Sequence, residues 1–131
     1  MVKEAAGPGL PALSHLYVEV RDLAAAYHFY VELLGLEALV GGPDSGYLRV
    51  GGRDGFHVGI EENLGLGEVD AGIEIVIRVE DVDATWARLG EAGVATGLPP
   101  ADQEWGMRHA WLRDPSGHRL SIYSPNRGDT G

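Results

Sequence analysis

Cysteine is absent from the 131 residues of this chain, and its absence excludes disulfides, thiolate metal sites and cysteine nucleophiles. Long apolar runs are missing as well, since no uninterrupted stretch approaches the roughly 20 residues of a membrane span. The N-terminus, MVKEAAGPGLPA, lacks the apolar segment of a secretory signal. We therefore expect a cytoplasmic, soluble protein without a membrane partner, whose stability comes from packing.

Basic residues are scarce, because 10 Lys and Arg stand against 20 Asp and Glu and leave a formal net charge of -10. Nucleic acids and anionic membranes require clustered Lys and Arg, so neither is expected as a partner. A neutral or cationic small molecule is the easier ligand. The apolar share of 44% and charged share of 23% are typical of a globular chain, and the length fits one compact domain.

Two turn-rich ends, residues 1–12 and 126–131, are expected to be flexible tails around a single domain at 13–125. The stretch LSHLYVEV alternates apolar and polar residues and predicts a strand. Asp22 then suits the N-cap of a helix that Gly35 closes. Short strands follow between the turn compositions GGPDSG and GGRDG. The first predicted module, 13–63, therefore consists of a strand at 13–20, a helix at 23–34 and strands at 36–41, 46–51 and 55–62.

The same order of elements recurs in a second predicted module at 72–125. An offset of 59 residues carries Asp22 onto Asp81 and Tyr27 onto Trp86. The second module has a strand at 72–80, a helix at 82–93 and strands near 94–98, 107–113 and 118–123. Two βαβββ modules that pair their sheets predict an α+β fold, with one curved mixed sheet, the helices outside and a concave inner surface.

Strand parity sorts the side chains between the two faces of this sheet, because successive residues point to opposite sides. The apolar face is predicted to hold Leu16, Val18, Val20, Phe56, Val58, Ile60, Ile73, Ile75, Ile77, Val79, Ala110, Leu112, Leu120 and Ile122. The concave face is then predicted to hold His15, Tyr17, Glu19, His57, Gly59, Glu61, Glu74, Val76, Arg78, His109, Trp111, Arg113, Arg119, Ser121 and Tyr123. A polar and aromatic binding pocket follows from this pattern.

The segments HLYVEVRDLAAAYHFYVELLGL and DPSGHRLSIYSP resemble the vicinal oxygen chelate superfamily over residues 13–125. That superfamily includes glyoxalase I, extradiol dioxygenases, fosfomycin-resistance proteins and bleomycin-binding resistance proteins. The resemblance implies the glyoxalase/bleomycin-resistance fold and a homodimer that closes the curved sheet. Because this fold hosts both enzymes and pure binding proteins, it leaves the activity open.

Metal-dependent members place their ligands at four positions, which the resemblance carries onto His15, His57, Glu74 and Ser121. The last position holds a glutamate in nearly all members, and a neutral serine hydroxyl is a poor metal ligand. No cofactor is therefore expected, with His15 and Glu74 forming at most a vestigial or weak metal site. The alternative cofactor is a divalent ion such as Zn, Ni, Mn or Fe. Without metal, His15 fits a pocket wall and Glu74 fits an ion pair with Arg78 or Arg119.

Two tryptophans favour a binding protein. Trp105 lies in the loop PPADQEWGM and Trp111 is predicted to point into the concavity, so both could stack on a planar aromatic ligand. Trp86, on a helix, is expected to serve packing. The predicted ligand-binding residues are Tyr17, His57, Arg78, Trp105, His109, Trp111, Ser121 and Tyr123.

These residues predict a non-catalytic protein that sequesters an antibiotic or another natural product and so confers resistance. The alternative is a metal-dependent enzyme of the glyoxalase I or extradiol dioxygenase type. It would use His15, Glu74 and His57 on a divalent ion that acts as a Lewis acid.

Overall fold

The computed structural model describes residues 14–52, 55–69, 72–94 and 96–125, so the two predicted tails lie outside the described residues. The elements follow the predicted order twice. The first module contains β1 (His15–Val20), α1 (Leu23–Tyr27), η1 (His28–Leu33), β2 (Glu37–Val40), β3 (Tyr47–Gly51) and β4 (His57–Glu62). The second contains β5 (Glu74–Arg78), α2 (Val82–Glu91), β6 (Thr96–Asp102), β7 (Met107–Arg113) and β8 (Arg119–Pro125).

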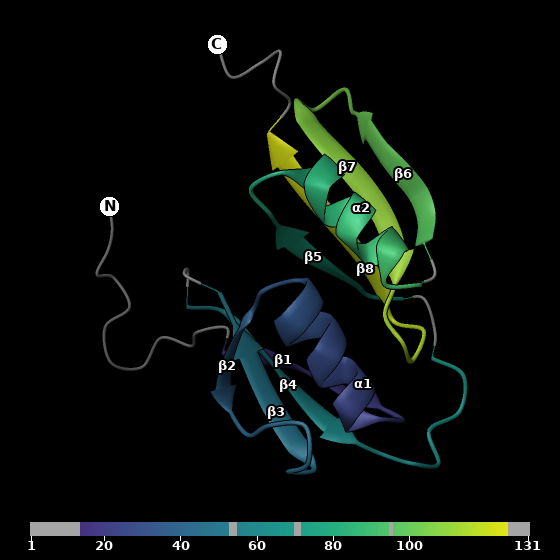
Figure 1. Ribbon diagram of the computed structural model, residues 1–131. Helices are drawn as coiled ribbons and strands as arrows, with labels where there is room; N and C mark the ends of the chain where they lie inside the picture. The colour runs from purple at the N-terminus through teal and green to yellow at the C-terminus, as the bar shows by residue number, and fades with distance from the viewer. Residues whose placement is uncertain (1–13, 53–54, 70–71, 95, 126–131) are drawn as a thin grey trace.

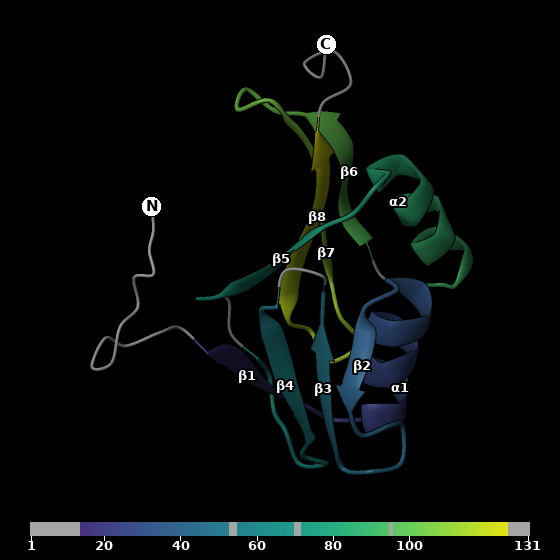
Figure 2. The same cartoon turned by 90° about the vertical axis from the view of Figure 1, so that its left-hand side faces the viewer.

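The strands form two four-stranded mixed sheets, shown in Figure 1. Sheet A has the order β1-β4-β3-β2 and sheet B the order β5-β8-β7-β6, and in each the first and last strands of the module are parallel. Both helices lie on the same side of the sheets (Figure 2). The predicted α+β class and its two modules are confirmed, while the hydrogen bonds divide the strands into two sheets where one continuous sheet was expected.

Each helix begins as predicted at an aspartate. The side chain of Asp22 accepts from the N–H of Ala25 at 3.1 Å, and that of Asp81 from the N–H of Ala84 at 3.1 Å. The first helix then widens into the π-helix η1, where the N–H of Leu34 bonds to the carbonyl of Phe29 at 3.0 Å. None of the helices among the described residues is long and apolar enough to cross a membrane.

The core lies between the helices and the strand faces that parity predicted. Val20, Ile60, Ala110, Leu120 and Ile122 are all buried, and the predicted pattern is confirmed there.

Two residues predicted on the apolar face are instead exposed, Phe56 at 54% and Ile73 at 62%. Each stands immediately before its strand, because β4 begins at His57 and β5 at Glu74. Both side chains line an open hollow between the modules together with core-face residues such as Val58 and Ile75, and this is why they are exposed.

The turn between β7 and β8 joins the second module to the first. Its Asp114 carboxylate is buried and accepts three hydrogen bonds, from the hydroxyl of Tyr30 at 2.7 Å and from the N–H groups of Ser116 and His118 at 2.9 and 2.8 Å. The His118 ring also bonds through Nε2 to the carbonyl of Glu19 at 2.6 Å. Burial, with Asp114 adding to it, raises the pKa of Tyr30, so its hydroxyl remains a donor.

Tyr30→Phe is expected to lower the free energy of unfolding by about 1 to 3 kcal/mol, because the buried Asp114 carboxylate loses one of its three donors. Urea denaturation measures the change. Tyr27→Phe is the matched control, since the Tyr27 hydroxyl has no hydrogen-bond partner among the described residues and its loss should cost less than about 0.5 kcal/mol. Equal effects of the two variants would show that the Tyr30–Asp114 bond does not stabilise the joint.

Candidate functional site

The open face of sheet A carries two histidines from neighbouring parallel strands. His15 on β1 lies directly opposite His57 on β4, and their rings are stacked with centroids 5.0 Å apart and planes at 12°. Each Nδ1 atom has a local partner, Ser14 Oγ at 2.8 Å for His15 and the carbonyl of Gly55 at 3.4 Å for His57. The two predicted residues are therefore brought together on one exposed surface.

Farther along the same face, Tyr17 bridges two carboxylates. Its hydroxyl donates to Glu61 at 2.7 Å and to Glu19 at 3.2 Å. The hydrogen bond to Glu61 raises the pKa of Tyr17, with smaller contributions from desolvation and from Glu19, so the hydroxyl stays protonated. Tyr47 lies over Gly59, where an added Cβ would come within 2.5 Å of the Tyr47 hydroxyl. Arg49 donates to the Tyr47 hydroxyl at 3.3 Å, so this half of the face carries two carboxylates and one guanidinium.

The corresponding face of sheet B carries an aromatic cluster centred on His109. The His109 ring stacks on Trp111 with centroids 4.7 Å apart and planes at 12°, and on Tyr123 at 5.3 Å and 26°. Trp105, in the turn between β6 and β7, meets the same ring edge-on at 5.8 Å and 69°. We refer to these four residues as the aromatic cluster.

Ser121 lies at the edge of the aromatic cluster. Its hydroxyl is 3.3 Å from Nε2 of His109, and the residue is fully buried. Burial lowers the pKa of His109, and the nearby Glu74 carboxylate offsets part of that effect, so the ring is neutral at pH 7. Ser121 therefore contacts His109 in the chain without ligand, and its contact with a ligand stays a prediction.

Glu74 is held on sheet B, away from the two histidines of sheet A. Its carboxylate accepts from Arg119 at 3.2 Å, which is one of the two ion pairs considered from the sequence. Arg78, on the same strand, has no hydrogen bond or ion pair with any described residue. Within the described ranges, no three His, Asp or Glu side chains cluster as metal ligands would. One chain therefore does not assemble the set His15, His57 and Glu74.

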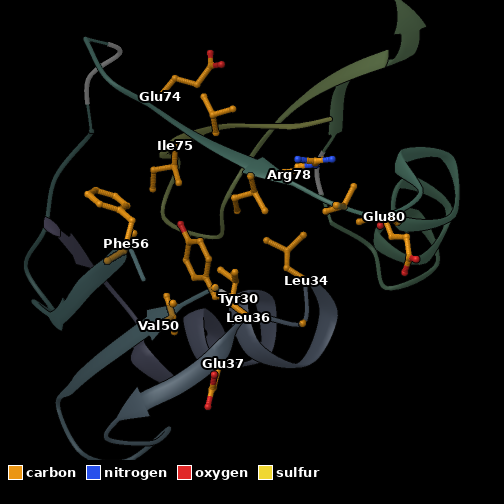
Figure 3. A pocket seen from close by; sticks show the side chains of 18 of the residues that line it. Tyr30, Leu34, Leu36, Glu37, Val50, Phe56, Glu74, Ile75, Arg78 and Glu80 are labelled. Carbon is orange, nitrogen blue, oxygen red and sulfur yellow. The ribbon is translucent and has the colours of Figure 1, made fainter. Parts of the chain in front are cut away.

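Two hollows lie beside these faces, and neither includes the aromatic cluster. One, of about 1210 Å³, opens between the modules and is lined by Tyr30, Val50, Phe56, Ile75 and Ile77 among others (Figure 3). The other, of about 550 Å³, lies between β1, β5 and the segment that links the modules. The predicted site residues Glu74 and Arg78 also line the first hollow. The sequence did not predict this hollow, because most of its apolar walls are core-face residues that are left partly uncovered only by the packing of one module against the other.

The model of the Glyoxalase/Bleomycin resistance protein/Dioxygenase superfamily matches residues 12–122. The chain belongs to this superfamily. The uncharacterized protein Rv0887c of Mycobacterium tuberculosis (strain ATCC 25618 / H37Rv) is 34% identical over 133 residues, which cover 89% of this chain and 76% of the relative.

Solved structures of other proteins share the fold of this chain over most of its length. A glyoxalase/dioxygenase from Nostoc punctiforme superposes with a TM-score of 0.76 at 19% identity, covering 95% of this chain and 99% of that one. TnmS3, an antibiotic binding protein from Streptomyces sp. CB03234, superposes with a TM-score of 0.69 at 28% identity, covering 89% of this chain and 98% of that one. The family and fold expected from the sequence are confirmed.

His109 gives this superfamily member a pH-dependent stability. Its folded-state pKa lies below the ordinary value of 6.5, so the unfolded chain binds more protons as the pH falls below that value. The stabilisation is complete above about pH 6.5 and declines as the pH drops toward the folded-state pKa. Thermal melts at pH 7.5 and 5.5 should show a smaller loss of stability for His109→Phe than for the wild type. An identical loss in both proteins would contradict this assignment.

Proposed function

We propose that this protein binds a planar aromatic small molecule against the aromatic cluster and releases it chemically unchanged. The observation that carries the proposal is the stack of Trp111, His109 and Tyr123 on an open sheet face, with Trp105 exposed beside it. Flat rings with a large apolar area bind flat ligands at little cost in conformational entropy. The likeness to TnmS3, at 28% identity, supports a natural product or antibiotic as the ligand. Sequestration of such a compound would confer resistance.

The charges favour a neutral or cationic ligand. The open face of sheet A presents Glu19 and Glu61 around Tyr17, and the chain as a whole has a formal charge of -10. Near the aromatic cluster, Glu74 is paired with Arg119 and His109 is neutral. Guanidinium groups are present on both faces, Arg49 beside Tyr47 and Arg78 on β5, so the preference for a cation rests on the net acidic charge of the chain.

A metal-dependent enzyme is the second candidate, and the paired rings of His15 and His57 favour it. A metal centre on these imidazoles needs at least one more ligand, and Glu74 of the same chain lies on the other sheet. Ser121 is buried behind His109 and is a poor ligand in any case. The residues of one chain thus support ligand binding better than metal chemistry.

The open faces also lead us to propose a homodimer. In one chain the aromatic cluster lies on an uncovered face, and β1 and β5 are edge strands of their sheets. Apolar side chains are exposed along these edges, Tyr17 on β1 and Val76 on β5. Unpaired edges beside exposed apolar groups are surfaces on which chains associate. A second copy that covers sheet B with its own sheet A would enclose the ligand.

Addition of a planar polycyclic antibiotic such as an anthracycline is expected to quench the tryptophan emission. Trp111→Ala should weaken binding by about 1 to 3 kcal/mol, the range for an aromatic anchor that is desolvated on binding. Fluorescence titration gives both results, and mass spectrometry should recover the compound intact. Trp86→Phe is the control, because Trp86 packs against the core and should leave the affinity unchanged.

A metal-dependent enzyme would give the opposite results in these experiments. Protein purified without chelator would then contain about one equivalent of a divalent metal, His15→Ala would remove it, and the test compound would emerge isomerised or ring-opened. These three results together would replace the binding function with the catalytic one.

Sedimentation equilibrium at micromolar concentration is expected to give twice the 14.0 kDa mass of one chain. Val76→Lys places a charge on the exposed β5 edge and should shift the protein toward the monomer. Leu64→Lys is the control, since Leu64 is 80% exposed but lies outside both sheets, in the segment between β4 and β5. A monomeric wild type would rule out the dimer.

A further inference from the structure

Three residues from β7 and β8 hold the His109 ring. Trp111 and Tyr123 stack on it, and Ser121 Oγ lies 3.3 Å from Nε2. Trp105 meets the ring edge-on and, at 58% exposure, is the one aromatic residue of the cluster that is largely solvent-exposed. The ring is therefore packed on several sides, and Trp105 is its most exposed aromatic neighbour.

The other ring nitrogen, Nδ1, is buried without a hydrogen-bond partner. Among the buried side-chain nitrogen and oxygen atoms of the described residues, it is the only one left unpaired. The comparably buried carboxylate of Asp114, by contrast, accepts three hydrogen bonds. Because an unpaired buried polar atom destabilises the fold, a group outside the chain is the natural partner for Nδ1.

The hydrogen-bonding capacity of a neutral imidazole indicates which chemical group can be the partner of Nδ1. With the ring proton on Nε2, facing Ser121, Nδ1 is an acceptor; with the proton on Nδ1, it is a donor. A hydroxyl group satisfies both cases, because it donates and accepts. The flanking rings of Trp111 and Tyr123 require that this hydroxyl be attached to a flat apolar body.

We propose that Nδ1 of His109 is the hydrogen-bond anchor for a hydroxyl on the ligand, and that the ligand class is the hydroxylated planar aromatics, such as phenols and hydroxyquinones. The proposal deepens the proposed function and rests on it. His109 thereby determines specificity, while Trp111 supplies stacking that is indifferent to the hydroxyl.

A matched pair of probes, 2-naphthol and 2-methylnaphthalene, tests the anchor because the two differ only in a hydroxyl and a methyl group of similar size. NMR titration of the wild-type protein should give about 3- to 10-fold tighter binding of 2-naphthol, as one buried hydrogen bond provides. In His109→Phe, which keeps a flat ring in the stack, the preference should fall to about 1-fold. In Trp111→Ala the affinity for both probes should fall by a similar factor.

A second measurement uses the unaltered protein, in case His109→Phe folds poorly. The ¹⁵N shift of His109 Nδ1 should move on addition of 2-naphthol and not on addition of 2-methylnaphthalene.

Equal affinity of the wild type for the two probes, with binding still reduced in Trp111→Ala, would overturn the anchor and leave the binding function intact. A preference that survives in His109→Phe would do the same, since the hydroxyl would then bind elsewhere. Failure of both probes to bind the wild-type protein would overturn the anchor together with the proposed function.

Discussion

The buried carboxylate of Asp114 is the contact on which the arrangement of this protein depends. It accepts a hydrogen bond from Tyr30, which lies 84 residues away in the chain, as well as two from its own turn. A carboxylate in this position is stable only while its donors remain in place. The turn between β7 and β8 is thereby held against the first helix, and Arg21 adds to the joint by donating to the carbonyl of Ser116. Each module is a simple local unit, but this joint determines how the two are placed.

That placement separates the residues whose combination would define an enzyme. His15 and His57 share the open face of sheet A, whereas Glu74 lies on sheet B in an ion pair with Arg119. A superfamily that includes enzymes and binding proteins uses the same fold for both, so the side chains that meet on one face decide the chemistry. On sheet B those side chains are aromatic, and the open edges of both sheets leave room for a second copy to cover them.

Ser121 has a physical role that differs from a simple loss of metal binding. Its small, fully buried side chain leaves space for the His109 ring above it and supplies a hydroxyl to Nε2. A glutamate at the same position would bring a carboxylate into a fully buried position, where it would either need a positive partner or draw a proton onto His109. The serine therefore offers a neutral hydroxyl to His109, whose pKa is lowered by burial.

The sequence by itself determined the two βαβββ modules, the aspartate caps and most of the buried strand faces, because side-chain alternation and capping are local and depend on neighbours in the chain. It also placed His109, Trp111 and Tyr123 on one face, since β7 and β8 are adjacent antiparallel strands. Only the tertiary structure decided that Glu74 lies apart from the histidines, that Ser121 is buried and that Nδ1 of His109 has no partner. These features arise where separate elements pack against one another, and no local pattern encodes the distances between them.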